Sequence, residues 1–140
     1  MTERIFVDSN IWIYLFTDDD DLKSNIASEF ISENVENNCL IISYQVVNEV
    51  CSVLKKKSYT EYDIRRVADD MLGLCEVCGY SNEIIYLASK LRDLYSFSFW
   101  DSQIISSALM SDCSILASED MQDGLKIENM VISNIIKHRM

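Results

Sequence analysis

The sequence contains no proline and only three glycines, Gly73, Gly79 and Gly124. Phosphate-binding loops and dinucleotide-binding fingerprints need several closely spaced glycines, so both are excluded. Long apolar runs are also missing, since none approaches the roughly 18 residues that a membrane-spanning helix needs. An acidic residue stands too early in the chain for a secretory signal. We therefore expect a soluble, cytoplasmic protein with no membrane contact.

Basic residues are few, with 12 Lys and Arg against 23 Asp and Glu, and the formal net charge is −11. This charge argues against broad, non-specific binding of nucleic acid, because affinity for phosphate comes from Lys and Arg. One local patch departs from the pattern and consists of Lys55, Lys56, Lys57, Arg65 and Arg66. The patch either contacts an RNA backbone or is a solvated turn between two helices.

The five cysteines favour reduced thiols in the core over a disulfide framework, because their number is odd and their neighbours are apolar. Cys75 and Cys78 form a C-x-x-C pair, but no second pair or nearby histidine completes a zinc site. A chain of 140 residues is long enough to bury one full core. We expect a single domain spanning residues 1–140.

Short apolar strands alternate with amphipathic helices along the chain. The expected strands are residues 5–7, 39–42, 74–78, 114–117 and, less clearly marked, 130–132. Six helices are expected. The first three end at residue 16, span 22–36 and end at residue 56, where Ser9 or Asn10 is the N-cap of the first and Ser43 that of the third. The other three span 60–72, begin at Ser81 and continue past residue 91, and begin after residues 97–100. This alternation predicts a three-layer α/β/α sandwich with a mostly parallel central sheet of four to five strands.

Four carboxylates lie where apolar runs end or helices begin. Asp8 ends the first strand, Asp120 follows the fourth, Glu49 lies in the helix after the second, and Asp101 begins a helix. Working residues of parallel sheets gather at the carboxyl ends of the strands. Crowded carboxylates repel one another, and a divalent cation with a preference for oxygen, Mg²⁺ or Mn²⁺, removes that cost. Taken singly, each acid also fits a helix cap, a turn or a solvated helix position.

The segments around these acids resemble the PIN-domain ribonucleases, especially the VapC-type toxins of toxin–antitoxin pairs. The matching segments are residues 5–10, 43–49, 98–101, 115–124 and 125–134, in family order over nearly the whole chain. The family usually ends in an Asn-Pro pair, whereas Asn134 is followed here by Ile135.

The resemblance implies a metal-dependent endoribonuclease in which metal-activated water cleaves a phosphodiester bond. The family's catalytic, metal-binding acids correspond to Asp8, Glu49, Asp101 and Asp120, of which Glu49 would bind a second ion or orient the water. The polar residues that orient these ligands correspond to Ser9 or Asn10 and Ser118, with Asp123 as an outer-sphere candidate. Histidine occurs once, as His138, so a mechanism based on a histidine pair is excluded.

The resemblance also implies an RNA substrate, a cognate antitoxin that places a basic side chain near the acids, and a homodimer. The candidate surface anchors for these contacts are the aromatic residues Tyr14, Phe16, Tyr44 and Tyr59. We expect at least half of these four side chains to pack in the core instead.

Several alternatives stay open on the sequence alone. A PIN nuclease of RNA processing without an antitoxin has the same residues, and a non-catalytic PIN-like scaffold for RNA or protein is disfavoured because all four acids are present. A haloacid-dehalogenase-type phosphatase needs a second Asp where Asn10 stands. A receiver domain needs an acid pair after its first strand, which is not visible.

Overall fold

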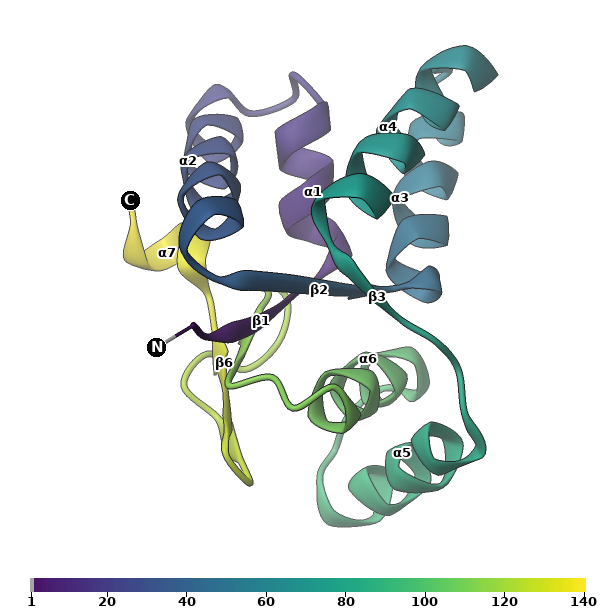
Figure 1. Cartoon of the computed structure of the whole chain (residues 1–140), viewed down its shortest axis with the longest axis vertical. Coiled ribbons are helices and arrows are strands. Elements are labelled where there is room, and N and C mark those ends of the chain that lie inside the picture. The colour runs from purple at the N-terminus through teal and green to yellow at the C-terminus, as the bar shows by residue number, and fades with distance from the viewer. Residues whose placement is uncertain (1) are drawn as a thin grey trace.

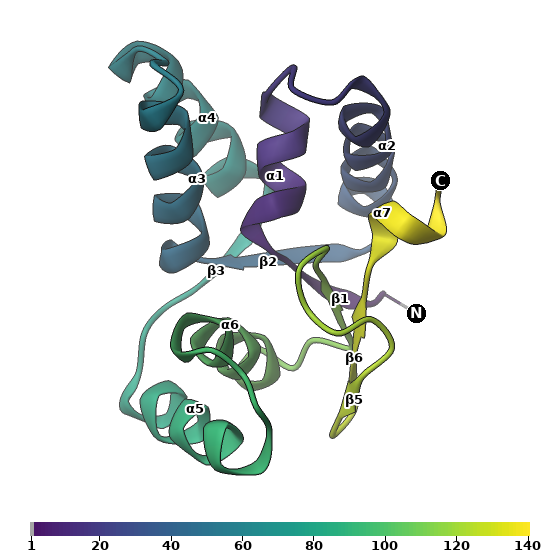
Figure 2. The same cartoon turned by 180° about the vertical axis from the view of Figure 1, so that it is seen from behind.

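The computed structural model describes residues 2–140, which form one six-stranded sheet with helices on both faces (Figure 1). The strands are β1 Arg4–Val7, β2 Cys39–Ser43, β3 Glu76–Cys78, β4 Ile115–Ala117, β5 Lys126–Ile127 and β6 Met130–Ser133. The helices are α1 Ser9–Phe16, α2 Asp21–Asn37, α3 Tyr44–Lys56, α4 Glu61–Leu74, α5 Asn82–Leu94, α6 Phe99–Met110 and α7 Ile135–His138. Helices α1 to α4 cover one face of the sheet, and α5 and α6 cover the other (Figures 1 and 2). The predicted three-layer sandwich is confirmed.

The strand order is β3-β2-β1-β4-β6-β5, and every neighbouring pair is parallel except β5 with β6. The first strand of the chain is therefore central, with β2 on one side and β4 on the other. Its residues Ile5, Phe6 and Val7 are at most 2% exposed. A strand buried on both faces reads as an unbroken apolar run, which is why the sequence marks it so clearly.

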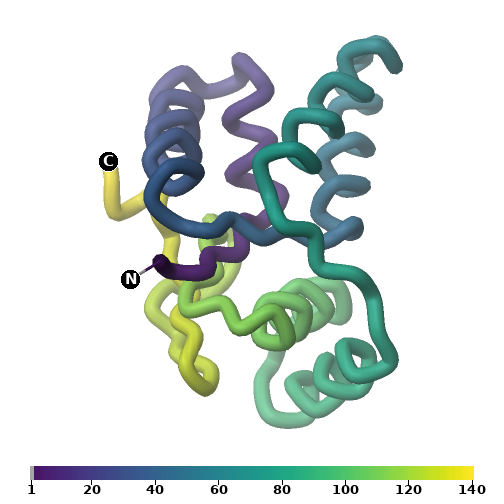
Figure 3. The backbone as a smooth tube through the Cα atoms, viewed as in Figure 1, coloured from purple at the N-terminus to yellow at the C-terminus, as the bar shows by residue number. Residues whose placement is uncertain are grey.

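One connecting segment carries the chain from one face of the sheet to the other. The segment between β3 and α5 crosses from the face covered by helices α1 to α4 to the face covered by α5 and α6 (Figure 3).

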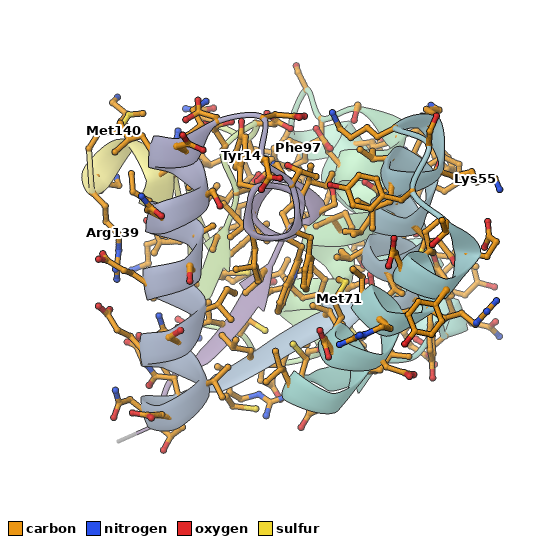
Figure 4. All side chains as sticks on the ribbon, turned by 90° about the horizontal axis from the view of Figure 1, so that it is seen from above. Tyr14, Lys55, Met71, Phe97, Arg139 and Met140 are labelled. Atoms are coloured by element: carbon orange, nitrogen blue, oxygen red, sulfur yellow. The ribbon has the colours of Figure 1, made fainter. Side chains whose placement is uncertain are left out.

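Trp12 of α1 is fully buried, and its indole N–H donates to the Val7 carbonyl at 3.2 Å. Seen from above, through the layer of α1 to α4, Met71 of α4 points inward toward α1, whereas Lys55 lies on the outer edge of the α3–α4 pair (Figure 4).

Most helix starts agree with the sequence prediction. Ser43, Thr60 and Ser81 each accept a hydrogen bond from a backbone N–H of the first helical turn, as N-cap side chains do. At α1 the prediction of Ser9 or Asn10 is wrong, because the N-cap is Asp8, whose carboxylate accepts from the Ser9 N–H.

The C-terminal region also differs from the prediction of four to five strands. Strands β5 and β6 form an antiparallel hairpin in which Glu128 has a φ of 54°. His138 lies in the short helix α7 rather than in a tail. Asn134, which no proline follows, caps that helix by accepting from the Lys137 N–H at 3.0 Å.

The cysteines are all free, and no helix within residues 2–140 is long and apolar enough to cross a membrane. Tyr14, Phe16 and Tyr59 pack against the core, whereas Tyr44 is 51% exposed. The expectation that at least half of the four aromatic anchors pack in the core is therefore confirmed.

The central strand should dominate the stability of the fold. We predict that Phe6→Ala lowers the free energy of unfolding by about 3–5 kcal/mol, because it opens a cavity at a fully buried position. Val131→Ala, at a 36% exposed position of β6, should cost only about 0.5 kcal/mol. Urea denaturation followed by circular dichroism measures both values, and similar losses for the two variants would contradict this view of the core.

Candidate active site

All four predicted carboxylates line one pocket at the carboxyl edge of the parallel strands. The pocket has a volume of about 500 Å³ and is lined by Asp8, Ser9, Gln45, Asn48, Glu49, Ser52, Tyr80, Trp100, Asp101, Ile104 and Asp120. These residues come from five separate parts of the chain, since the ends of β1, β2, β3 and β4 meet at this edge. The structure therefore brings together acids that lie up to 112 positions apart, from Asp8 to Asp120.

Asp8 is the most buried of the four acids, at 5% exposure. Its Oδ1 accepts from the Ser9 N–H at 2.8 Å, and its Oδ2 accepts from the Ser118 hydroxyl at 2.8 Å and the Asn10 amide at 3.5 Å. Burial raises the pKa of Asp8 to about 6, although the hydrogen bonds from Ser118 and Ser9 act in the opposite direction. The negative charges of Glu49 and Asp101 raise the pKa further.

Asn10 connects the first strand end to the turn that carries Asp120. Its amide N–H₂ donates to Asp120 Oδ2 at 3.1 Å, and its carbonyl accepts from the Glu119 N–H at 3.1 Å. Ser118 adds a second connection, because its hydroxyl oxygen accepts from the Asp120 N–H at 3.3 Å. Asn10 and Ser118 thus lie behind the acids, where they fix the position of Asp120 relative to Asp8.

Glu49 is held by one neighbour on each carboxylate oxygen. Ser9 donates its hydroxyl proton to Oε2 at 3.0 Å, and Gln45 donates from its amide to Oε1 at 2.8 Å. Gln45 lies one turn before Glu49 on α3 and also reaches the Trp100 carbonyl at 3.4 Å. Glu49 is therefore oriented toward the pocket by α1 and α3 together.

Asp101 lies in the first turn of α6, where its N–H donates to the N-cap Ser98 at 3.1 Å. A carboxylate at this place is favoured by the positive end of the helix dipole. Asp101 and Asp120 also line a second, smaller pocket of about 250 Å³. These two acids are therefore shared by two pockets.

Glu119, the neighbour of Asp120, faces away from the pocket. Its carboxylate forms an ion pair with Lys23 at 2.7 Å and accepts a hydrogen bond from the Tyr14 hydroxyl. The Lys23 ammonium lies 5.0 Å from the centroid of the Tyr14 ring. These contacts fasten the turn that carries Asp120 to helices α1 and α2.

Asp123 and the basic patch lie outside the pocket. Asp123 accepts a hydrogen bond from the Asn134 N–H at 2.9 Å and pairs with His138. Both contacts hold the pKa of Asp123 below its usual range, and the hydrogen bond from Asn134 has the larger effect. Lys55 and Lys57 form ion pairs with Glu61 and Asp19. Nearest to the pocket are Lys55 and Lys56, which lie one turn beyond Ser52 on α3, whereas Arg65 and Arg66 are on α4.

The donor chemistry of the pocket fits a hard divalent cation, because the charged groups that surround it are all carboxylates. Asp8 is also a buried carboxylate that a cation would stabilise. Within residues 2–140, however, no three His, Cys, Asp or Glu side chains are arranged so that they could hold a metal ion as they stand. The side chains of the less buried acids would have to turn toward Asp8, and metal ligation by these four acids stays a prediction.

The part of the pocket that is not acidic was not predicted from the sequence. Gln45, Tyr80 and Trp100 line it beside the acids, yet none was selected. The position of Gln45 four residues before Glu49, on the same face of one helix, was a readable signal. Tyr80 gave no such signal, because its place follows from a loop between β3 and α5.

Comparison with known proteins identifies relatives of the fold. A model of the PIN domain family matches residues 5–123. No curated protein matches the chain in sequence.

Solved structures with the same fold include toxin–antitoxin proteins of several bacteria. VapBC2 from Rickettsia felis, bound to a DNA fragment from its promoter, has a TM-score of 0.72 at 18% identity, covering 93% of this chain and 97% of that chain. A toxin–antitoxin complex from Klebsiella pneumoniae has a TM-score of 0.70 at 21% identity, covering 91% and 95%. VapC20 from Mycobacterium tuberculosis, a toxin that cleaves the sarcin–ricin loop, has a TM-score of 0.66 at 16% identity, covering 80% and 86%.

The raised pKa of Asp8 makes stability depend on pH in a defined direction. Because the folded protein holds this proton up to about pH 6, ionisation of Asp8 should reduce the free energy of unfolding as the pH rises from 4 to above 6. The difference from 3.8 to about 6 corresponds to about 3 kcal/mol. Relative to wild type, Asp8→Asn should therefore gain about this much stability between pH 4 and pH 8, measured by urea denaturation in EDTA.

Ser118→Ala provides the matched control for this measurement. The substitution removes a hydrogen bond that favours the ionised form of Asp8, so it should raise the pKa of Asp8 further. The loss of stability of this variant with rising pH should therefore extend to higher pH than the loss in wild type. A difference between wild type and Asp8→Asn that is constant from pH 4 to pH 8 would contradict the assignment.

Proposed function

Because this chain belongs to the PIN domain family, we propose that it is a metal-dependent endoribonuclease that acts as the toxin of a toxin–antitoxin pair. The observation that carries the proposal is the convergence of Asp8, Glu49, Asp101 and Asp120 on one pocket. The described toxin relatives share the fold and support the choice of RNA as substrate, since one of them cleaves the sarcin–ricin loop.

Asp8, Asp101 and Asp120 would hold the Mg²⁺ or Mn²⁺ ion, and Glu49 would hold a second ion or orient the attacking water. The bound cation would lower the pKa of water and offset the negative charge that develops on the scissile phosphate. Without the cation, four carboxylates at one pocket would repel a phosphodiester backbone.

The protein's own residues supply orientation. Ser9 and Gln45 hold both oxygens of Glu49, so this carboxylate is aimed before substrate binds. Asn10 and Ser118 hold Asp8 and Asp120 at a fixed separation, as the outer hydrogen-bond partners of metal ligands do. Such preorganisation reduces the cost of arranging charged groups during the reaction.

An antitoxin fits the same electrostatic argument. The acids of the pocket and the net charge of −11 favour a partner that places an arginine or lysine among the carboxylates. The relatives from Rickettsia felis and Klebsiella pneumoniae are themselves toxin–antitoxin complexes, which supports a protein partner for this chain. A nuclease of RNA processing without an antitoxin remains the second candidate, and a neighbouring small reading frame whose product inhibits cleavage would separate the two.

The first test is cleavage of RNA. Wild-type protein should cut structured RNA with Mg²⁺ or Mn²⁺ and stop in EDTA. Asp8→Asn and Asp120→Asn should each lose at least about 100-fold in kcat/KM, because outer partners of metal ligands alone are worth 10–100-fold. Asp93→Asn, at an exposed position of α5, is the matched control and should cleave like wild type.

Either active-site variant retaining wild-type cleavage, or activity that persists in EDTA, would overturn the mechanism.

The second test is metal binding without turnover. Addition of Mn²⁺ should raise the Tm of wild-type protein, because a ligand that binds only the folded state stabilises it. The increase should vanish in Asp8→Asn and Asp120→Asn and persist in Asp93→Asn, as measured by differential scanning fluorimetry. An equal increase in all four proteins would mean that Mn²⁺ binds elsewhere.

A further inference from the structure

Two large aromatic side chains of the acidic pocket are unusually exposed. Trp100 is 63% exposed and Tyr80 is 57% exposed, although both line the pocket that contains the four carboxylates. The only other tryptophan, Trp12, is fully buried. Large aromatic residues at binding surfaces offer wide contact area at little conformational cost, so their place beside the acids calls for a ligand with a flat apolar face.

The backbone and neighbours of Trp100 are fixed by the fold. Its ring packs edge-on against Phe99, with centroids 5.1 Å apart and planes at 81°. The Arg92 guanidinium lies 4.5 Å from the Phe99 centroid and donates to the Ser102 hydroxyl at 2.7 Å. The Trp100 carbonyl accepts from Gln45, the residue that also orients Glu49. Trp100 is thus tied both to α6 and to the candidate catalytic acid.

The remainder of the pocket is polar. Gln45, Asn48 and Ser52 form a stripe along one face of α3, and Ile104 is the one aliphatic residue that lines the pocket within the described chain. An apolar protein segment would leave this polar stripe without partners. A nucleotide fits better, because its base has an apolar face and its sugar and phosphate are polar.

We propose that Trp100 and Tyr80 form a base-stacking subsite, which holds an unpaired nucleobase adjacent to the scissile phosphate. The inference rests on the proposed endoribonuclease function and assigns these two residues to substrate positioning. The base must be unpaired, because stacking on a protein side chain requires a base that has left its helix. The polar stripe of α3 then leads the strand from the acids toward Lys55 and Lys56, which lie one turn beyond Ser52.

The test uses the protein with all four acids present, so that Mg²⁺ can bind, and a short unpaired RNA with slowly hydrolysed phosphorothioate linkages, labelled for anisotropy. RNA binding should quench the tryptophan emission, since Trp12 is shielded and Trp100 is not. In this protein, Trp100→Leu should abolish the quenching, and Trp100→Leu and Tyr80→Leu should each weaken RNA binding about tenfold. The matched control is Tyr86→Leu, which removes a 68% exposed tyrosine of α5 outside this pocket and should leave binding unchanged.

An RNA with one abasic nucleotide next to the cleavage position sharpens the test. The abasic change should weaken binding to the protein with all four acids present and have no further effect once Trp100→Leu is added, because both changes remove the same contact. The inference is overturned if RNA binds without quenching, if it fails to bind, or if Trp100→Leu and Tyr80→Leu bind it as Tyr86→Leu does. Failure of the proposed function is distinct, because it is seen as absence of cleavage by wild-type protein.

Discussion

The carboxylate of Asp8 is the point on which the arrangement of the site depends. It ends the central strand β1, caps helix α1 and accepts a hydrogen bond from Ser118 at the end of β4. One side chain thereby joins two strand ends and a helix start. Placing an acid at 5% exposure raises its pKa to about 6, so the fold accepts a local cost in stability at the position where a cation is expected.

Different polar residues fix the positions of the different carboxylates of the site. Asn10 and Ser118 connect Asp8 with Asp120, while Ser9 and Gln45 hold Glu49. Glu119 directs its charge away from the pocket to Lys23. No buried side-chain nitrogen or oxygen within residues 2–140 lacks a hydrogen-bond partner, so the acids are crowded without leaving polar atoms unsatisfied.

The fold was readable from the sequence where local signals and tertiary structure agree. Apolar runs marked the buried strands, and Ser43 and Thr60 marked two helix starts by their capping chemistry. The hairpin of β5 and β6 was missed as such because its turn contains Glu128, a residue that rarely adopts a positive φ, instead of the usual glycine. The N-cap of α1 is Asp8 rather than Ser9 or Asn10, and the sequence left Asp8 open as a cap or a ligand because an Asp caps a helix as well as Ser or Asn does.

For the site, the four acids could be placed at one edge because parallel strands present their carboxyl ends together. The contacts of Gln45 and the position of Tyr80 could not, since they depend on how α3 and the loop after β3 approach the first turn of α6. Asp123 does not line the pocket although Asp120, three residues before it, does, because nearby residues in a turn need not point in one direction. Its carboxylate instead holds the backbone of Asn134 and pairs with His138.

The strand order has a consequence for biosynthesis. The central strand β1 is synthesised before its partner β4 and the turn with Ser118 and Asp120, because these lie more than 100 residues later in the chain. Until then Asp8 lacks its hydrogen bond from Ser118, and the pocket lacks one wall. A nascent chain that does not yet include Asp120 is therefore unable to assemble the complete acidic pocket, and the topology delays any activity of that pocket until β4 and its turn have been made.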